Sequence, residues 1–145
     1  MIAPYRGSFH VEYFPKTAST AFAFGDLVEV LSTAAGAGTL VKATATSTAL
    51  LGTIQRAVVS TDADYASTTM VPVLVGDADA EWLCDVSTGT AATTDIGEWI
   101  DIDDENSVDV NAYTLGVMQV VGFISTTKVL AKIAKKSGKE LPITA

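Results

Sequence analysis

The sequence has one cysteine, Cys84, and one histidine, His10. A single cysteine excludes a disulfide within the chain and a metal site built from several cysteines. Cys84 lies in the alternating segment AEWLCDV, so we expect a small buried hydrophobe rather than a nucleophile. One histidine without a second histidine or a cysteine nearby disfavours zinc, and no nucleophile-elbow sequence accompanies it. We therefore expect no enzyme activity, no cofactor and no metal.

Long apolar runs are also missing. None approaches the roughly 18 residues of a membrane span, and the start lacks the basic and then apolar segments of a secretory signal. We therefore expect no membrane partner.

Basic residues are few and unevenly placed. The formal net charge is −8, and no Lys or Arg lies between Arg56 and Lys128, where thirteen of the seventeen acidic residues fall. This balance argues against nucleic acid as a partner, because phosphate binding needs a basic surface. Two interpretations stay open: a solvated acidic surface, or an acidic outer face with basic termini that meet an acidic partner.

The acidic stretch GEWIDIDDENSVDVNA, residues 97–112, invites comparison with a calcium loop. Counting from Asp101, the glycine expected at position 6 is Asn106 and the glutamate expected at position 12 is Ala112. The flanks alternate with period 2, which predicts a β-hairpin with Ile100, Ile102, Val108 and Val110 on its buried side. Trp99, Asp101, Asp103 and Asp109 are then expected on the other side, with Asp104-Glu105-Asn106 at the tip.

Short alternating segments predict strands along most of the chain, and helix signals are scarce. They include SFHVEYF, LVEVL, MVPVLV, EWLCDV, LGVMQVVGFIS and KVLAKIA. About nine or ten strands with turn residues between them predict an all-β fold, a single small β-barrel or sandwich of short antiparallel strands. We expect an extended N-terminal arm over residues 1–17, a β-barrel domain over 18–134 and a loosely ordered C-terminal tail over 135–145.

Two of these segments carry further expectations. Pro72 in MVPVLV favours an edge strand or a bulge, because proline cannot donate to a strand ladder. LGVMQVVGFIS is apolar on both faces, which predicts a strand covered on both sides or placed at a subunit contact.

The order of the segments AFAFGDLVEVL, LLGTIQRAVV, VPVLVGDADAEWLCDV, TTDIGEWIDIDD and LGVMQVVGFISTTKVLAKIA resembles that of the small β-barrel (β-tulip-like) decoration, or cement, proteins of tailed bacteriophage heads. The resemblance covers about residues 18–134 and rests on strand order and turn placement. That family often has Gly-Asp before the late hairpin, whereas this chain has Asp95-Ile96-Gly97.

The resemblance implies a structural virion protein, made in the host bacterial cytoplasm, that binds the outside of an assembled capsid. It further implies a homotrimer at three-fold positions, the major capsid protein as partner, and a stabilising rather than catalytic role.

Candidate interface residues lie near the chain ends and on the late hairpin. The arm combines aromatic residues with Pro4 and Pro15, which limit regular pairing, so it can lie extended across a capsid seam. Its aromatic residues either cap their own barrel or cross to a neighbour, and Trp99 is either an interface anchor or a core residue. We expect removal of residues 1–7 to leave the barrel folded and to weaken binding. The candidate capsid or subunit interface comprises Tyr5, Arg6, Phe9, Tyr13, Phe14, Lys16, Trp99, Lys135 and Lys136.

A second function class is a phage head-fibre or tail-associated carbohydrate-binding module. Such a module needs exposed aromatic residues grouped with Asp and Asn in a groove. Trp99 with Asp101 and Asp103 is the candidate group in this sequence.

Overall fold

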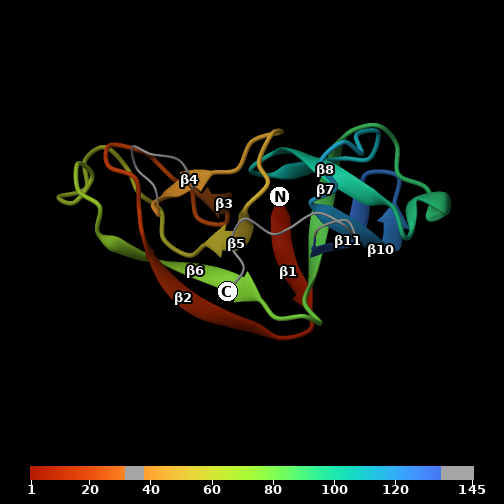
Figure 1. Cartoon of the computed structure of the whole chain (residues 1–145), viewed down its shortest axis with the longest axis horizontal. Coiled ribbons are helices and arrows are strands. Elements are labelled where there is room, and N and C mark those ends of the chain that lie inside the picture. The colour runs from red at the N-terminus through yellow and green to blue at the C-terminus, as the bar shows by residue number, and fades with distance from the viewer. Residues whose placement is uncertain (32–37, 135–145) are drawn as a thin grey trace.

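The computed structural model describes residues 1–31 and 38–134, and this part of the chain is all-β (Figure 1). The predicted fold class is therefore confirmed. No helix among the described residues is long and apolar enough to cross a membrane. The elements are β1 (Ile2–Arg6), β2 (Phe9–Pro15), β3 (Leu27–Val30), β4 (Leu40–Lys42), β5 (Leu50–Ile54), β6 (Met70–Gly76), β7 (Glu81–Thr88), the 3-10 turn η1 (Thr93–Asp95), β8 (Trp99–Asp104), β9 (Ser107–Asp109), β10 (Met118–Ser125) and β11 (Lys128–Ile133).

Five strands close into a small barrel. The ring order is β7-β11-β10-β8-β9, and the parallel pairing of β9 with β7 closes it, while the other pairs are antiparallel. Alternate residues of these strands point inward, and Ile100, Ile102, Val108 and Val129 are buried in one core cluster. The sequence pattern therefore predicted the buried side of the late hairpin correctly.

A second, five-stranded sheet precedes the barrel in the chain. Its order is β2-β6-β5-β3-β4, with every neighbouring pair antiparallel. A separate apolar cluster, including Val28, Ile54, Val71 and Val73, covers one side of it. Strands β5 and β6 approach closely at Gly52, where a Cβ atom would lie 1.9 Å from the carbonyl oxygen of Leu74. Only glycine fits there. The barrel thus starts at β7, not near residue 18 as predicted.

Strand β6 lies inside this sheet, between β2 and β5, so the expectation of an edge strand from Pro72 is wrong. The carbonyl oxygen of Pro72 accepts a hydrogen bond from the backbone nitrogen of Gln55, at 2.9 Å. In an antiparallel pair the N–H and C=O of one residue point the same way, so the missing donor of Pro72 falls beside Gln55, just past the end of β5. The ladder loses little there.

The predicted arm is extended, and both of its strands are paired. Strand β1 pairs with β7, where Pro4 faces Trp82, and β2 pairs with β6 along its whole length, from Phe9 to Pro15. Both are edge strands of their sheets, where proline is tolerated. Ile2 is 1% exposed and belongs to the barrel core cluster. The expectation that residues 1–7 are dispensable for folding is therefore wrong.

The sheet and the barrel share buried contacts, and Figure 1 shows β1 between them. Leu27 of β3 and Leu50 of β5 belong to the same cluster as the barrel interior. The backbone nitrogen of Leu27 donates to the carbonyl oxygen of Glu105 in the β8–β9 turn, at 2.9 Å. Thr44 also forms an isolated antiparallel bridge with Asp104. The turn of the acidic hairpin therefore connects the two sheets through backbone hydrogen bonds.

Candidate functional site

The aromatic residues of the first two strands divide into two groups. Phe9 packs edge-on against Trp82, with ring centroids 5.0 Å apart, and Phe14 packs against the cluster of the second sheet. Tyr5 and Tyr13 are instead 52% and 61% exposed. The sequence left open whether these aromatic residues pack within their own chain or against a neighbour, and Phe9 and Phe14 pack within their own chain. Only the two tyrosines are available to a partner.

Arg6 lies beside Tyr5 on β1. Its guanidinium carbon is 5.7 Å from the centre of the Tyr5 ring, and Nη2 donates to Oε1 of Glu81 at 2.7 Å. The bond to Glu81 raises the pKa of Arg6. Because Arg6 is largely exposed, it can still take part in a contact surface.

Lys16 is not a surface residue, and its assignment to an interface is wrong. Its side chain has no exposed area, and Nζ donates to the carbonyl oxygens of Asp64, Tyr65 and Ser67 at 2.6, 3.2 and 2.5 Å. All three ammonium protons are thus used within the chain, which is how a buried lysine is tolerated. Sequence could not reveal this, because the carbonyls lie about fifty positions away.

Beside Lys16, Asp64 binds Arg56 through two hydrogen bonds of 2.7 and 2.6 Å. Together with the donated hydroxyl of Thr69, the Arg56 guanidinium holds the pKa of the Asp64 carboxyl far below its usual range. The segment that follows β5 is therefore held by two cations.

Trp99 is half-buried and lies on the side of β8 opposite the buried Ile100 and Ile102. It pairs with Gln119 of β10 in register and does not belong to either core cluster. The core alternative for Trp99 is therefore excluded, while its contact with a partner stays a prediction.

Asp101 was expected beside Trp99 in solvent, and this expectation is wrong. It is 6% exposed, because the segment that follows β9 folds over it. Its Oδ1 accepts hydrogen bonds from the backbone nitrogens of Leu115 and Gly116, at 2.9 and 2.8 Å. Backbone groups thus occupy this carboxylate, which removes it from the predicted carbohydrate-binding group.

The hairpin tip has the predicted turn. Asp104 Oδ1 accepts from the backbone nitrogen of Asn106 and from the hydroxyl of Ser107, both at 2.8 Å. No group of three or more His, Cys, Asp or Glu side chains among the residues with a described placement could hold a metal ion.

Strand β10 lies between β8 and β11 in the barrel. The sequence predicted that this strand is covered on both sides or forms a subunit contact. Met118 and Val120 point inward and are buried. Towards the end of the strand Ile124 is 45% exposed. The outer side is therefore only partly covered within one chain.

Among the described residues, most cationic side chains are engaged within the chain. Lys16 is buried, and Arg6, Arg56 and Lys128 pair with Glu81, Asp64 and Asp85. Lys135 and Lys136, the two remaining interface candidates, lie outside the described residues, as does the predicted tail. The described surface is consequently acidic, in agreement with the net charge of −8.

The two chemically distinctive side chains of the sequence have ordinary structural settings. Cys84 is fully buried, and burial raises the pKa of its thiol to about 12, so it is inert as a nucleophile. His10 is exposed between Glu12 Oε2 at 2.9 Å and Asp77 Oδ1 at 2.7 Å, and these hydrogen bonds raise its pKa.

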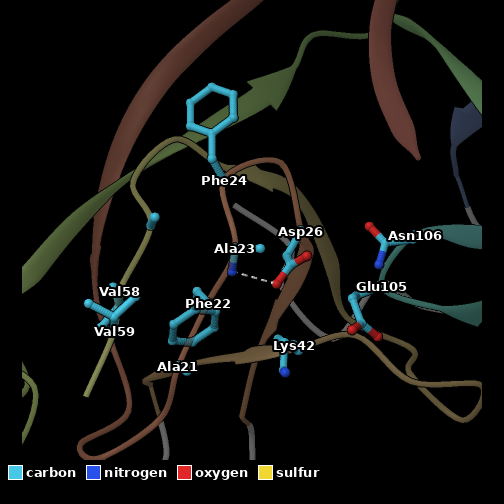
Figure 2. Close-up of a pocket in the computed structure, with 11 residues that line it drawn as sticks. Ala21, Phe22, Ala23, Phe24, Asp26, Lys42, Val58, Val59, Glu105 and Asn106 are labelled. Carbon is cyan, nitrogen blue, oxygen red and sulfur yellow. Dashed lines mark hydrogen bonds between the residues drawn. The ribbon is translucent and has the colours of Figure 1, made fainter. Parts of the chain in front are cut away.

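A depression with a volume of about 530 Å³ lies where the second sheet meets the β8–β9 turn, and Figure 2 shows the residues that line it. The turn before β3 forms its rim, held by the bond from the backbone nitrogen of Ala23 to Asp26 Oδ2 at 2.8 Å and by Gly25 at φ +90°. Burial raises the pKa of Asp26. Phe24 on this turn is 61% exposed. The lining consists of Ala21, Phe22, Ala23, Phe24, Asp26, Lys42, Ala57, Val58, Val59, Glu105 and Asn106.

This depression has an apolar floor, carboxylates and an amide, but its lining contains no Ser, Cys or His to act as a nucleophile or base. It can accept an apolar or polar group by contact. The sequence analysis missed it, because Phe24 and Glu105 are far apart in the chain and only the AFAFGD turn was visible as a local pattern.

Comparison with known proteins gives no family for this chain. No protein-family model matches it, and no curated protein matches it.

Proposed function

We propose that this chain is a structural virion protein that binds the outside of an assembled phage capsid as a trimer and stabilises the shell. The segment order that resembles phage decoration proteins supports this proposal. The observation that carries it is the exposed apolar surface of a small barrel-containing fold. The large hydrophobic side chains that are about half exposed or more are Met1, Tyr5, Val11, Tyr13, Phe24, Val59, Met70, Ile96, Tyr113 and Ile124.

Such side chains are favourable in an assembly, because a partner removes their apolar area from water. Because a capsid repeats the same subunit contacts, many copies of the chain can bind it through the same surface. The protein acts by binding the assembled state more tightly than the free subunits, so no bond is made or broken.

Co-sedimentation tests the proposal. Purified chain is mixed with heads of its own phage, either mature or stripped of decoration, and the heads are pelleted. We expect saturable binding to stripped heads and little binding to heads whose sites are filled. Absence of the chain from both pellets at micromolar concentration contradicts the proposal.

A carbohydrate-binding module is the second candidate. Its site would be the depression of Figure 2 rather than the group of Trp99, Asp101 and Asp103 predicted from the sequence. Phe24 supplies an exposed aromatic face, and Glu105 and Asn106 supply hydrogen-bonding groups. A glycan array with wild type and Phe24→Ala tests this candidate: it requires sugar binding that the substitution abolishes.

A further inference from the structure

Strand β2 has a free edge. It is the last strand of the second sheet and pairs with β6 from Phe9 to Pro15 without a register shift. No described strand pairs with its other edge, and Figure 1 shows β2 along the margin of the molecule. Past the end of the strand the chain meets β4, where the backbone nitrogen of Thr17 donates to the carbonyl oxygen of Leu40 at 3.2 Å. Residues 10–13 are all exposed, so the edge before that point is open to solvent.

Pro72 shows which backbone groups of β2 point to this free edge. The carbonyl oxygen of Pro72 accepts from the backbone nitrogen of Gln55, so it points to β5 and away from β2. Tyr13, which is opposite Pro72, therefore belongs to a non-hydrogen-bonded pair, and its own N–H and C=O point away from β6. Because this direction alternates along a strand, the same holds for Phe9 and Val11. Each of these residues thus presents a donor and an acceptor at the free edge.

The other end strands of the described sheets are protected against such pairing. Strand β1 contains Pro4 and has a register shift between Pro4 and Arg6, and β4 is only three residues long. Proline, bulges, lysine and short length all hinder the addition of another strand. From Phe9 to Phe14, β2 has no proline, no lysine and no bulge. It is therefore the edge to which another strand can add.

The residues of β2 match a second copy of the same strand. Two copies can pair antiparallel with Val11 opposite Val11 at the centre. Phe9 of each copy then lies opposite Tyr13 of the other, which makes an aromatic pair and brings the free N–H and C=O groups together. The same register puts His10 of each copy opposite Glu12 of the other, at the closely spaced positions of the ladder. Both side chains are about half exposed, so a cation meets a carboxylate twice.

Neighbouring registers lose this match. A shift by two residues in one direction puts His10 opposite His10. The same shift in the other direction puts Glu12 opposite Glu12, and Phe9 opposite Pro15, which has no N–H to donate. In the matched register Pro15 instead lies opposite Gly7, where the chain turns at φ +94° and the strand has ended. The pattern of β2 thus favours one register and favours a second copy as the partner.

We propose that two copies of this chain pair through the free edges of β2, antiparallel and centred on Val11, so that their second sheets become one continuous sheet. This contact goes beyond the proposed function and does not depend on it. Both copies use the same surface, so the contact closes at two copies and is separate from a three-fold contact. The net charge of −8 on each copy opposes association, so we expect the pairing at submillimolar rather than nanomolar concentration.

Val11→Pro tests the pairing. Proline removes an N–H that points to the free edge and none that bonds to β6, and Pro15 already occupies the same edge of β2. Val11→Thr keeps the N–H and the strand propensity, so it is the matched control. The molar mass of each folded protein is measured by light scattering and sedimentation equilibrium at submillimolar concentration. We expect wild type and Val11→Thr to have about twice the molar mass of Val11→Pro.

Two charge variants test the register and do not depend on proline being tolerated. Glu12→Lys puts a lysine opposite His10 of the second copy, and His10→Glu puts two carboxylates opposite each other. We expect each variant alone to self-associate about tenfold more weakly than wild type at about pH 6, because two opposite-charge pairs become like-charge pairs. An equimolar mixture should associate as wild type does, since the introduced lysine then lies opposite the introduced glutamate.

Several results would overturn the pairing. They are an equal molar mass for wild type and folded Val11→Pro, whether that mass is of a monomer or a trimer, and a loss of association in Val11→Thr as large as in Val11→Pro. Charge variants that associate as wild type does, or a mixture no tighter than either variant alone, overturn it as well. Failure of the chain to bind heads overturns the proposed function instead and leaves this contact in place.

Discussion

Lys16 holds the segment between β5 and β6 through the carbonyl oxygens of Asp64, Tyr65 and Ser67. Replacing it by methionine keeps the length of the side chain and leaves these buried acceptors without a donor. Because an unsatisfied buried acceptor costs about 1–3 kcal/mol, we expect Lys16→Met to lower the free energy of unfolding by about 2–4 kcal/mol in urea titration. Lys132→Met, on the barrel surface, is the control and changes it by less than about 0.5 kcal/mol. Equal stability of the two variants contradicts the buried role of Lys16.

Asp101 performs a similar task for the segment after β9, where it accepts from the backbone nitrogens of Leu115 and Gly116. We expect Asp101→Ala to destabilise the fold by about 2 kcal/mol, because two backbone donors lose a charged acceptor. Glu98→Ala, an exposed acid nearby, is the matched control and has little effect. Thermal melting of both variants measures the difference.

The acidic hairpin gives a separate prediction about calcium. Its sequence lacks the closing glutamate of a calcium loop, and Asp101 is occupied by backbone donors. Adding calcium to millimolar concentration should therefore leave the melting midpoint unchanged. A rise of several degrees would show that these carboxylates bind the ion.

His10 makes the stability depend on pH in a defined direction. Glu12, and then Asp77, raise its pKa above the value of the unfolded chain. A raised pKa adds stability that is complete below the unfolded-state value of about 6.5 and disappears as the pH rises through the folded-state value. The melting temperature of wild type should exceed that of His10→Gln by the largest margin below about pH 6.5, and this margin should shrink as the pH rises. A margin that grows with pH contradicts this assignment.

At the scale of elements, β1 is part of the fold. Ile2 is buried in the barrel core cluster, and β1 pairs with β7 from Ile2 to Arg6, with a register shift between Pro4 and Arg6. Truncating a buried isoleucine to alanine costs about 2–5 kcal/mol, so Ile2→Ala should lower the urea midpoint clearly, and deletion of residues 1–7 should lower it further. Tyr5→Thr, on the same strand but 52% exposed, is the control. Point variants, not truncation, therefore separate binding from folding.

The alternation of residues predicted which residues of an element share a side, but not which side is covered. It placed Ile100 and Ile102 together, and both are buried in the barrel. Phe9, Val11 and Tyr13 likewise alternate along β2, yet Phe9 packs on Trp82 whereas Val11 and Tyr13 are 50% and 61% exposed. The difference depends on where a distant strand docks, which a local period of two does not encode.

The inner position of β6 and the burial of Lys16 also could not be predicted from the sequence, because both depend on distant parts of the chain. A proline normally indicates an edge strand. Here β6 is an inner strand, and Pro72 is tolerated because β5 ends at Ile54, next to the position opposite Pro72. Where β5 ends cannot be read from the residues around Pro72. The second sheet, with strand neighbours as distant as β2 and β6, is likewise set by long-range pairing.

At the scale of the whole molecule, the proposed function is the stabilisation of an assembled shell by bound copies of the chain. A chain that binds only the assembled shell stabilises the shell by RT ln(1 + [L]/Kd) at each site, where [L] is the concentration of free chain. This is about 2.7 kcal/mol for each site when the free chain is at a hundred times Kd. Because the sites repeat over the shell, modest affinity at each one has a large summed effect.

Calorimetry of heads measures this effect directly. Stripped heads are heated alone and with a saturating excess of the chain. We predict that the chain raises the unfolding temperature of the shell until the binding sites are filled. Heads that melt at the same temperature with and without saturating wild-type chain would contradict the stabilising role.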